Sequence, residues 1–403
     1  MKKLLEINVS ANSGSTGRIA EEIGQLAVAN GYDCYMAYGR SNNHSRLKTI
    51  RIGNGWDCKV HALETRLFDN HGFASKQATR KFIRELEQIN PDIIHLHNIH
   101  GYYINVEYLF EYLRDTGVPV VWTLHDCWPM TGHCSYFDFV NCDKWKTFCC
   151  KCPNKKKYPS SYLLDRSKEN FLKKRKLFTS VKNISFVTPS YWLERVVKQS
   201  FFNSYSVKVI HNGVDLTVFR PVVDESVRIK YGLKPEEKII LGVASTWDRR
   251  KGLADFMKLH DLLGKKERIV LVGLNDGQIR NLPENVIGIK RTENVKELAS
   301  LYSIADVFVN PTYVDNFPTT NIEALACGTP VVTYKTGGSP EAVDEATGRV
   351  VDKGDVLALH KAISGILHTG KGQYSSLCRQ RAEMKFNKDE RFQDYIELYN
   401  SLL

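Results

Sequence analysis

The stretch 315–341 holds two acidic side chains, Asp315 and Glu323, that stand eight positions apart. Asn316, Phe317 and Pro318 lead into a predicted helix that carries Glu323 on its second turn. Unpaired N–H groups at a helix N-terminus bind a diphosphate, and a carboxylate accepts hydrogen bonds from two ribose hydroxyls. The spacing therefore predicts a nucleotide pocket. The alternative is a surface helix with routine charges.

A second candidate site is the loop SANSGSTG, residues 10–17, which follows the first predicted strand. Gly14 and Gly17 allow the backbone to approach a ligand, and the next helix offers unpaired N–H groups to an anion. The spacing is not that of a G-x-G-x-x-G fingerprint, so a flexible turn is an equal alternative. In an open α/β sheet, however, such a loop lies at the carboxyl end of its strand, where ligands bind.

Histidines stand at the ends of two predicted strands. His125 and Asp126 end the run VVWTLHD, and His97 and Asn98 end the run DIIHLHN. The carboxyl end of a parallel strand favours a role in catalysis for His125 over a purely structural one. His97 and Asn98 fit a ligand-facing position and a hydrogen-bonded scaffold equally well.

Six of the ten cysteines fall between positions 127 and 152, with the spacing Cys134-x7-Cys142-x6-Cys149-x2-Cys152 for four of them. A disulfide scaffold is unusual in a large intracellular chain. Four thiolates that include a C-x2-C pair can hold tetrahedral zinc, which would order a long loop without regular periodicity. Structural zinc, a disulfide-linked loop and free thiols all remain open, and none of them implies catalysis.

The elements that must position these residues alternate between apolar strands and helices, which indicates parallel, doubly wound α/β sheets. The series restarts after residue 221, so we expect two domains, 1–205 with a Cys-rich insertion at 127–160 and 206–385, followed by a C-terminal helix at 386–403. Strands are predicted at 4–9, 34–39, 92–98, 119–126, 184–190 and 207–215, and then at 238–245, 268–273, 285–289, 306–312 and 329–334.

Composition sets broad limits. The 403 residues suit two α/β domains, and 56 Lys and Arg against 45 Asp and Glu favour anionic partners. The start MKKLLEINVS is predicted to be a buried strand and not a signal peptide, and no apolar window is long enough to cross a membrane. We therefore expect a cytoplasmic protein, and peripheral contact with the inner face of the membrane is compatible with its charge.

Basic residues crowd the segment 144–176, where Lys and Arg outnumber the two acids Asp165 and Glu169. An anionic membrane surface or a lipid diphosphate could dock there, and a solvated helix face is an equal alternative. No motif supports nucleic-acid binding. The basic residues are Lys144, Lys146, Lys151, Lys155, Lys156, Lys157, Arg166, Lys168, Lys173, Lys174, Arg175 and Lys176.

Taken together, several strings resemble family 4 glycosyltransferases, which have the GT-B fold. DNFPTTNIEALACGTPVVTYKTGGSPE (315–341) resembles their E-x7-E region. STWDRRKG (245–252) is similar to their phosphate-binding loop, and VIHNGVDLTVFRP (209–221) to their interdomain passage. LHDCWPMTGHC (124–134) resembles a subgroup that assembles bacterial exopolysaccharide and capsule of the colanic-acid type.

The resemblance implies two Rossmann-like domains that face a cleft, with the C-terminal helix crossing back to the first domain. It also implies a retaining transferase that moves a hexose-type sugar from a UDP- or GDP-sugar to a glycan, expected to be lipid-linked, in surface polysaccharide biosynthesis. The alternatives on the same fold are a nucleotide-sugar epimerase and a non-catalytic carbohydrate-binding protein.

Residue roles follow from the same resemblance. Glu323 would bind the ribose, Asp315 the transferred sugar, and Lys251 the diphosphate. Asn316, Phe317 and Pro318 would bring backbone groups to the sugar and diphosphate, with Arg249 and Arg250 beside Lys251, His125 near the anomeric carbon, and Gly14 and Gly17 on the phosphate side. The acceptor-side candidates are His97, Asn98 and Asp126.

Two positions depart from the family pattern. Asp315 stands where a glutamate is usual and reaches one methylene less far, and Ser245 stands where an arginine is usual. No Asp-x-Asp motif occurs in a suitable loop, so we expect no catalytic metal or other cofactor. Lys251, the neighbouring arginines and helix N-termini would neutralise the leaving diphosphate instead.

Overall fold

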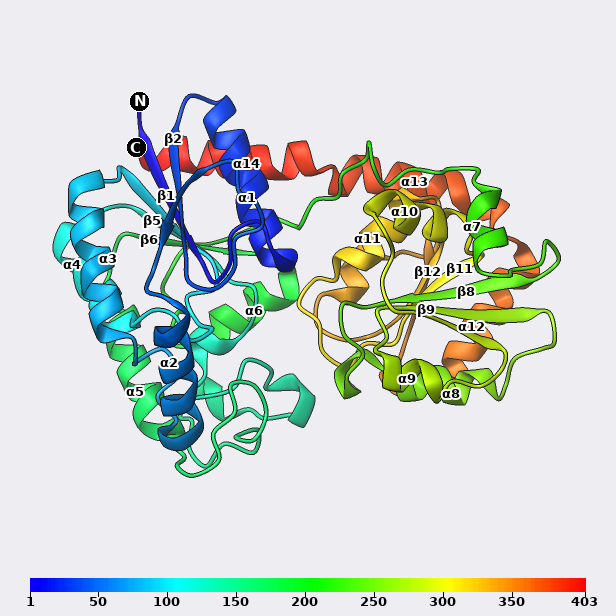
Figure 1. Cartoon of the computed structure of the whole chain (residues 1–403), viewed down its shortest axis with the longest axis horizontal. Helices are drawn as coiled ribbons and strands as arrows, with labels where there is room; N and C mark the ends of the chain where they lie inside the picture. Colours follow the sequence, from blue (N-terminus) through cyan, green and yellow to red (C-terminus); the bar gives the residue numbers. More distant parts are fainter. The chain divides into compact units, whose positions relative to one another are not determined.

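The computed structural model describes residues 1–403 and divides into two compact units (Figure 1). The first unit contains Met1–Ile210 together with Phe392–Leu403, and the second contains His211–Arg391. The break in the chain falls five residues after the position expected from the sequence. Each unit has its own sheet and its own core.

The first unit is built on a seven-stranded parallel sheet of order β3-β2-β1-β4-β5-β6-β7. Its central strands are buried on both faces because helices cover each side, as is usual for parallel sheets. The strands are β1 (Lys3–Asn8), β2 (Asp33–Tyr38), β3 (Lys48–Arg51), β4 (Ile93–Leu96), β5 (Val120–Thr123), β6 (Ile184–Thr188) and β7 (Val207–Val209).

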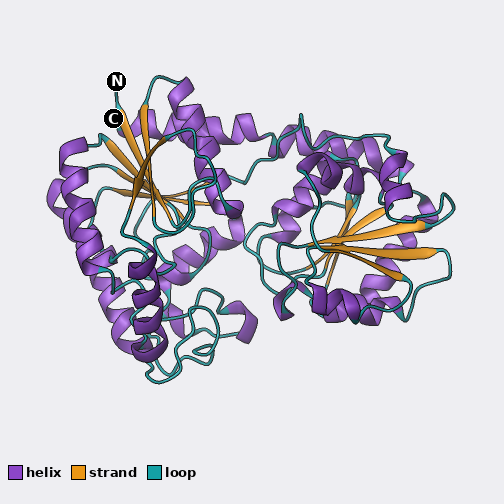
Figure 2. Cartoon of the chain, in the orientation of Figure 1, coloured by secondary structure: helices purple, strands orange, loops and turns teal.

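Helices pack on both faces of this sheet (Figure 2). One core joins the sheet to α1 and α14, and the other joins it to α3, α4, α5 and α6. The helices are α1 (Gly14–Ala29), α2 (Gly55–Phe68), α3 (Lys76–Ile89), α4 (Val106–Thr116), α5 (Ser167–Phe178) and α6 (Tyr191–Gln199), with 3₁₀ turns η1 (Trp128–Met130), η2 (Asp138–Val140) and η3 (Lys144–Lys146).

The second unit has a six-stranded parallel sheet of order β10-β9-β8-β11-β12-β13. Its strand order 3-2-1-4-5-6 is that of a Rossmann fold, in which the crevice at the carboxyl ends of the strands receives the ligand. The strands are β8 (Lys238–Val243), β9 (Glu267–Val272), β10 (Val286–Ile289), β11 (Val307–Asn310), β12 (Val331–Tyr334) and β13 (Gly348–Val351).

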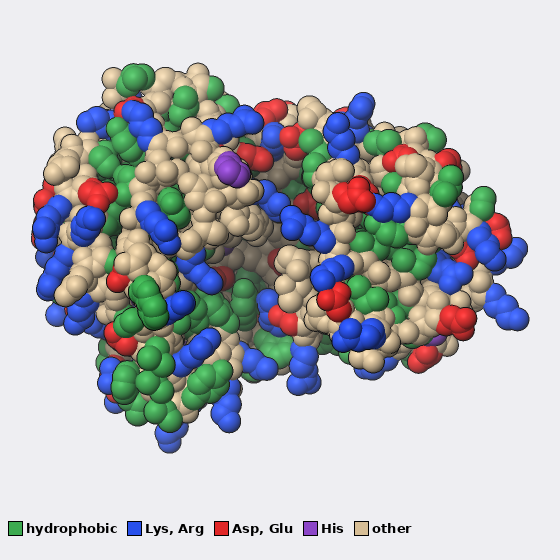
Figure 3. Space-filling model, viewed as in Figure 1, with side chains coloured by type: hydrophobic (Ala, Val, Ile, Leu, Met, Phe, Trp, Pro, Cys, Tyr) green, Lys and Arg blue, Asp and Glu red, His purple; other side chains and the backbone are tan.

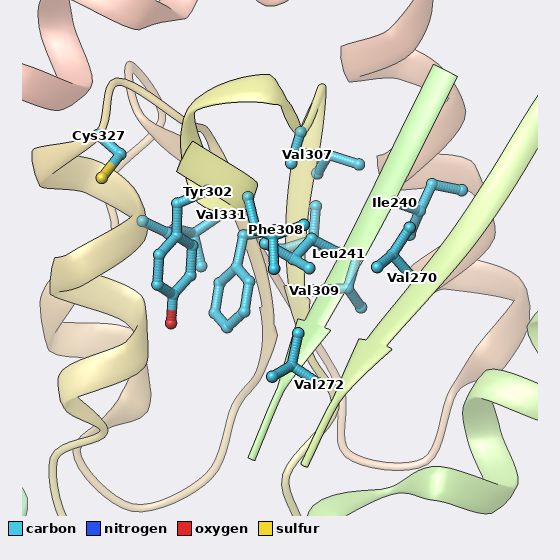
Figure 4. Close-up of a cluster of buried hydrophobic side chains, with 14 of the residues drawn as sticks. Ile240, Leu241, Val270, Val272, Tyr302, Val307, Phe308, Val309, Cys327 and Val331 are labelled. Atoms are coloured by element: carbon cyan, nitrogen blue, oxygen red, sulfur yellow. The ribbon is translucent and has the colours of Figure 1, made fainter. Parts of the chain in front are cut away.

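The core of the second unit fills the space between this sheet and its helices. Phe308 of β11 packs against Tyr302, with ring centroids 5.4 Å apart, and both side chains are fully buried (Figure 4). The helices are α7 (Glu225–Lys230), α8 (Leu253–His260), α9 (Asp276–Arg280), α10 (Val295–Ile304), α11 (Thr319–Ala326), α12 (Val356–Thr369) and α13 (Gly372–Phe386), with turns η4 (Arg249–Lys251) and η5 (Ser339–Ala342). The last helix, α14 (Lys388–Leu402), begins in this unit and continues into the first.

Helix α14 ends in the first unit, where Phe392, Tyr395, Ile396 and Tyr399 are buried. The Tyr399 hydroxyl lies 2.6 Å from His95 Nδ1, so this helix is held to the sheet by polar as well as apolar contacts. These four side chains recur at helical spacing and form the buried face of the helix.

The predicted doubly wound α/β architecture is confirmed, because both sheets are wholly parallel. Strands β3 and β13 were not expected. Both lie at sheet edges and carry charged, exposed residues, so they lack the apolar run that marks the other strands. No helix combines the length and the apolar character needed to cross a bilayer.

Candidate functional site

Lys251 and Asp315, which lie 64 positions apart in the chain, meet in the second unit. The Lys251 ammonium lies 2.5 Å from Asp315 Oδ2, and both side chains are largely but not fully buried. Lys251 follows β8 and Asp315 follows β11, and these strands are neighbours in the sheet. Strand order therefore brings a cation and an acid together at the carboxyl edge of the sheet.

Backbone contacts fix the two loops that carry this pair. The Arg250 carbonyl accepts hydrogen bonds from Tyr313 N (2.7 Å) and Thr312 Oγ1 (3.2 Å). Gly252 has φ +77°, and a Cβ there would lie 2.1 Å from the Pro311 carbonyl oxygen. Only glycine allows this approach.

The two arginines beside Lys251 differ in their contacts and exposure. Arg250 Nη2 lies 2.8 Å from Asp248 Oδ2, and Asp248 also accepts from the Arg250 backbone N–H at the start of η4. Arg249 is exposed. Of the three predicted cations, the structure brings Lys251 to the acidic loop.

Glu323 lies on α11, and its carboxylate is oriented by a partner that the sequence did not reveal. The hydroxyl of the fully buried Tyr302 donates to Glu323 Oε2 at 3.0 Å. The start of α11 is also anchored, because Asn321 accepts from Asn310 Nδ2 (2.8 Å) and donates to Ser339 Oγ (2.9 Å). This buried chain of hydrogen bonds joins α11 to β11 and η5.

The glycine pair 337–338 supports the acidic loop from the other side. Gly337 has φ +54°, and a Cβ there would lie 1.8 Å from the Asp315 carbonyl oxygen. Gly338 N donates to the Asn316 carbonyl at 3.0 Å. The main chain of the predicted sugar-binding residues is therefore held in one conformation.

Phe317 and Pro318 fill structural positions at the start of α11. The Phe317 side chain is buried and contacts His211, with ring centroids 4.9 Å apart, and Pro318 is the N-cap of α11. His211 Nε2 lies 3.2 Å from Glu341 Oε2. Neither His211 nor Glu341 was singled out from the sequence, although both lie in strings that resembled the family.

In the first unit, the ends of β4 and β5 bring predicted histidines together. His97 Nδ1 lies 3.0 Å from His125 Nε2, and the two rings are stacked with centroids 5.3 Å apart. Burial lowers the pKa of His125 to about 4, so this ring is neutral at pH 7. A neutral imidazole pair can share one hydrogen bond and leave an outer nitrogen of His125 to act as a polar group.

The other predicted residues of this edge form its frame. Asn98 N donates to Asn8 Oδ1 at 3.2 Å, which ties the ends of β1 and β4 together. Asp126 lies 2.8 Å from His100 Nε2 and accepts from Trp128 N at 2.8 Å. Burial works to raise the pKa of Asp126, but His100 and the Trp128 amide outweigh it and hold the pKa below its usual value.

The two glycines of the first loop have distinct environments. Helix α1 begins at Gly14, which has φ +70° and no atom within 4 Å of a would-be Cβ. A Cβ at Gly17 would lie 2.8 Å from the Ser10 carbonyl oxygen. Gly17 therefore allows the helix to pack on the loop, while Gly14 lies beside open space.

A buried polar group that the sequence did not suggest lies deeper in the same sheet. Potential metal-ligand atoms of Glu6, His95 and His97 all lie within 4.8 Å of one another. Burial and then the neighbouring Glu21 raise the pKa of Glu6. Glu6 and His95 lie within β1 and β4, and His97 follows the end of β4.

Five of the six cysteines of the insertion line one pocket, together with the aromatic residues Phe137 and Trp145. The cysteines are Cys134, Cys142, Cys149, Cys150 and Cys152, and all ten cysteines of the chain are free thiols. A hydrogen bond from Cys134 lowers the pKa of Cys152 to about 7. No three of these sulfurs lie within 4.8 Å of one another.

The basic run 144–176 does not form one exposed surface, because Lys174 is directed into the protein. Its side chain is buried, and its ammonium donates to the carbonyls of Trp128 (2.8 Å) and Thr131 (3.1 Å). Burial lowers its pKa to about 7. Lys173 pairs with Glu107 at 2.7 Å, so part of the basic run is committed to contacts within the first unit.

Comparison with known families identifies the class of protein. A model described as Glycosyltransferase Family 4 matches residues 16–218, and one described as Glycosyl transferases group 1 matches residues 224–385. With its two parallel sheets, the chain is a glycosyltransferase of the GT-B fold, as expected. It belongs to glycosyltransferase family 4, whose members are retaining enzymes that use nucleotide sugars.

Individual relatives agree with this family. The chain is 24% identical over 420 residues to the putative colanic acid biosynthesis glycosyl transferase WcaC of Escherichia coli (strain K12), a match that covers 99% of this chain and 100% of that protein. It is 31% identical over 189 residues to the D-inositol 3-phosphate glycosyltransferase of Mycobacterium marinum, and that match covers 44% of this chain and 40% of that protein.

Solved structures share the fold over the full length. Sucrose-phosphate synthase from Thermosynechococcus elongatus gives a TM-score of 0.75 at 20% identity and covers 100% of this chain and 99% of its own. Anabaena Alr3699/HepE in complex with UDP gives a TM-score of 0.71 at 15% identity and covers 100% of both chains.

Buried neutral histidines predict acid sensitivity of the first unit. Burial lowers the pKa of His61 to about 3, and its Nε2 accepts from Gly72 N at 3.1 Å. The unfolded chain binds a proton on His61 near pH 6.5 and the folded chain does not, so stability is lost as pH falls from about 6.5 towards 3. At pH 5 the loss is about 2 kcal/mol for this histidine.

Urea unfolding at pH 7 and pH 5, followed by tryptophan fluorescence, measures this loss. His61→Gln should be less stable at pH 7 but should lose less stability on acidification than the wild-type protein. Equal losses in the two proteins would show that His61 does not contribute.

Proposed function

We propose that the protein transfers a hexose-type sugar from a UDP- or GDP-sugar to a lipid-linked glycan acceptor in the cytoplasm, during assembly of a cell-surface polysaccharide. The proposal rests on the Lys251–Asp315 ion pair and on Glu323, which follows Asp315 by eight residues and accepts a hydrogen bond from Tyr302. The full-length similarity to a colanic acid biosynthesis enzyme supports the choice of pathway class.

In the proposed donor site, Lys251 receives the charge of the departing diphosphate. Cleavage of the glycosidic bond concentrates negative charge on the β-phosphate, and a positioned cation stabilises that charge in the transition state. Lys251 then exchanges its ion pair with Asp315 for one with phosphate, and Asp315 turns to a hydroxyl of the transferred sugar. Arg249, which is exposed, and the amides of the loop at 316–317 add further donors.

Glu323 would accept hydrogen bonds from the two ribose hydroxyls. Its carboxylate is already oriented by the Tyr302 hydroxyl, so little conformational freedom is lost when the nucleotide binds. Because Asp315 is shorter than the glutamate usual at its position, the hydroxyl that it reads is expected to differ from that read in other members.

In the first unit, we assign His125 to the anomeric end of the donor, where a neutral imidazole can contact a sugar hydroxyl. Gly14 and Gly17 line the phosphate side, and His97, Asn98 and Asp126 hold the acceptor side of this edge. The anomeric configuration would be retained because the acceptor attacks the same face of the sugar from which the diphosphate leaves. An oxygen of the leaving phosphate would take the proton of the acceptor hydroxyl. No metal ion is required in this scheme.

An epimerase and a non-catalytic binding protein are the alternatives on the same fold. An epimerase would convert its nucleotide sugar with no acceptor present. A binding protein would take up glycan without releasing nucleoside diphosphate. A panel of nucleotide sugars, with and without lipid-linked acceptor, distinguishes all three by the products formed.

The donor assignment predicts that Glu323→Ala weakens nucleoside diphosphate binding by about 10- to 100-fold, since one hydrogen bond to a charged group contributes about 1.5–3 kcal/mol. Tyr302→Phe should weaken nucleoside diphosphate binding by a smaller factor, because the Glu323 carboxylate stays in place but loses the hydrogen bond that orients it. Glu284→Ala, an exposed carboxylate in the same unit, is the matched control. Isothermal titration calorimetry measures all four proteins, and unchanged affinity in Glu323→Ala would remove the assignment.

We further propose that the insertion binds a structural zinc ion through Cys134, Cys142, Cys149 and Cys152. These four thiols share one pocket, and the buried cation of Lys174 would offset the negative charge of a zinc–thiolate centre. Zinc would draw the sulfurs together, because Zn–S bonds are about 2.3 Å long. The ion would order the insertion and take no part in transfer.

Metal analysis of the purified protein tests the zinc proposal. The wild-type chain should carry about one zinc, and Cys149→Ser with Cys152→Ser should lose it and become less stable to heat. Cys58→Ser, in the same unit but outside the pocket, should keep the metal. Wild-type protein without zinc, and equally stable with and without a chelator, would contradict the proposal.

A further inference from the structure

Helix α2 presents its apolar side chains outward. Trp56, Val60 and Leu63 are 73%, 51% and 56% exposed, while the buried residues of the helix are His61 and Thr65. Residues spaced at i, i+4 and i+7 share one face of a helix, so the three apolar side chains form one stripe. A surface helix of a globular protein ordinarily has the opposite arrangement, with its apolar stripe on the core.

A second segment extends this stripe. Residues 162–164 run beside the C-terminal end of α2, because Tyr162 N donates to the Arg66 carbonyl (2.8 Å) and Leu164 N to the Leu67 carbonyl (3.2 Å). Tyr162, Leu163 and Leu164 are 58%, 64% and 42% exposed. The apolar α2 surface is defined here as Trp56, Val60, Leu63, Tyr162, Leu163 and Leu164.

Figure 3 shows hydrophobic side chains gathered at the lower end of the first unit, where Figure 1 places α2 and the insertion. Lysine and arginine side chains surround them in the same view. Large apolar patches with a polar rim mark sites where a partner or a membrane binds.

Exposed basic side chains stand around the apolar α2 surface. Lys59, whose ammonium lies 4.6 Å from the Trp56 ring centroid, and the side chains of Arg66, Lys156 and Lys157 are exposed. Lys155 Nζ donates to the Leu163 carbonyl at 3.3 Å, at the edge of the surface.

The nearby acids are engaged within the protein. Asp57 accepts from Asn54 N in the capping box of α2, and Glu64 accepts from Asn70 Nδ2 at 2.8 Å. Asp165 accepts from Cys152 N and from Ser167. These carboxylates keep their negative charge, but the Lys and Arg side chains of the rim outnumber them.

We infer that the apolar α2 surface docks into the headgroup region of an anionic lipid bilayer. Trp56 and Tyr162 are of the types that favour the membrane–water interface, and the aliphatic side chains between them reach the acyl boundary. The basic rim meets lipid phosphates, and this electrostatic attraction weakens as salt is raised. A protein partner would have to match a mainly basic rim, whereas an anionic bilayer does so without further specificity.

This inference rests on the proposed function, because it explains how a chain without a spanning helix reaches a lipid-linked acceptor. Of the basic run 144–176, Lys155, Lys156 and Lys157 border this surface, and α2 supplies three of its six apolar side chains. Lys174 is buried and Lys173 is paired with Glu107, whereas the stripe on α2 is open.

Co-sedimentation of the full chain with vesicles tests the inference. The wild-type protein should bind phosphatidylglycerol-containing vesicles, bind phosphatidylcholine vesicles weakly, and release as salt is raised. The triple variant Trp56→Ser, Val60→Ser, Leu63→Ser should lose at least about tenfold in vesicle affinity. Lys156→Glu with Lys157→Glu should lose affinity for the anionic vesicles and become less sensitive to salt.

The matched control is Ile229→Ser with Leu357→Ser, which removes side chains that are 81% and 70% exposed in the second unit. It should bind vesicles as the wild-type protein does. Trp56 is the most exposed of the tryptophans, so its quenching by brominated lipid reports insertion, and Trp56→Phe should bind but lose that signal.

Equal vesicle binding by the triple variant and the wild-type protein would overturn the inference. So would a wild-type dimer that the triple variant loses, because the surface would then be an interface between two copies. Hydrolysis of a soluble nucleotide sugar should be the same in all variants. A protein that binds vesicles through α2 but turns over no nucleotide sugar would leave the docking surface in place and remove the proposed function.

Discussion

The ion pair between Lys251 and Asp315 is the contact on which the proposed donor site depends. It exists because β8 and β11 are neighbours in the second sheet, so the loops that follow them meet at one edge. A lysine held near an acid is oriented and yet can exchange that partner for a phosphate. In the proposed donor site, Asp315 therefore orients the Lys251 ammonium before the diphosphate binds.

Buried hydrogen bonds hold the groups around this pair in place. Tyr302 orients Glu323, and Asn321 links α11 to β11 and η5. In the first unit, His97 and His125 support each other in the same way at the ends of β4 and β5. The side chains that we propose meet a ligand are thus held by hydrogen bonds to their neighbours. This restricts their motion and lowers the entropic cost of binding.

Much of the fold follows from the sequence, because most strands are apolar runs between helices. β3 and β13 were missed because edge strands can be short and charged, as in KTIR at 48–51. The donor-site strings were recognisable, but Tyr302 and His211 were not assigned roles. Their contacts join residues 21 and 130 positions apart, and no local pattern encodes such contacts.

Burial was the other property that the sequence could not supply. Lys174 stands in a basic run, where composition suggests an exposed side chain, yet it is enclosed by the insertion. On α2 the periodicity identifies a stripe but not whether that stripe faces the core. Side-chain type predicts burial only on average, and the exceptions at Lys174 and Trp56 required the structure.

The most direct test of the central claim compares nucleoside diphosphate with nucleoside, for the base that the enzyme prefers, in wild-type protein and in Lys251→Met. If Lys251 receives the diphosphate, calorimetry should show at least about tenfold weaker diphosphate binding in the variant and the same nucleoside affinity in both proteins. Equal diphosphate affinity in the two proteins would contradict the account.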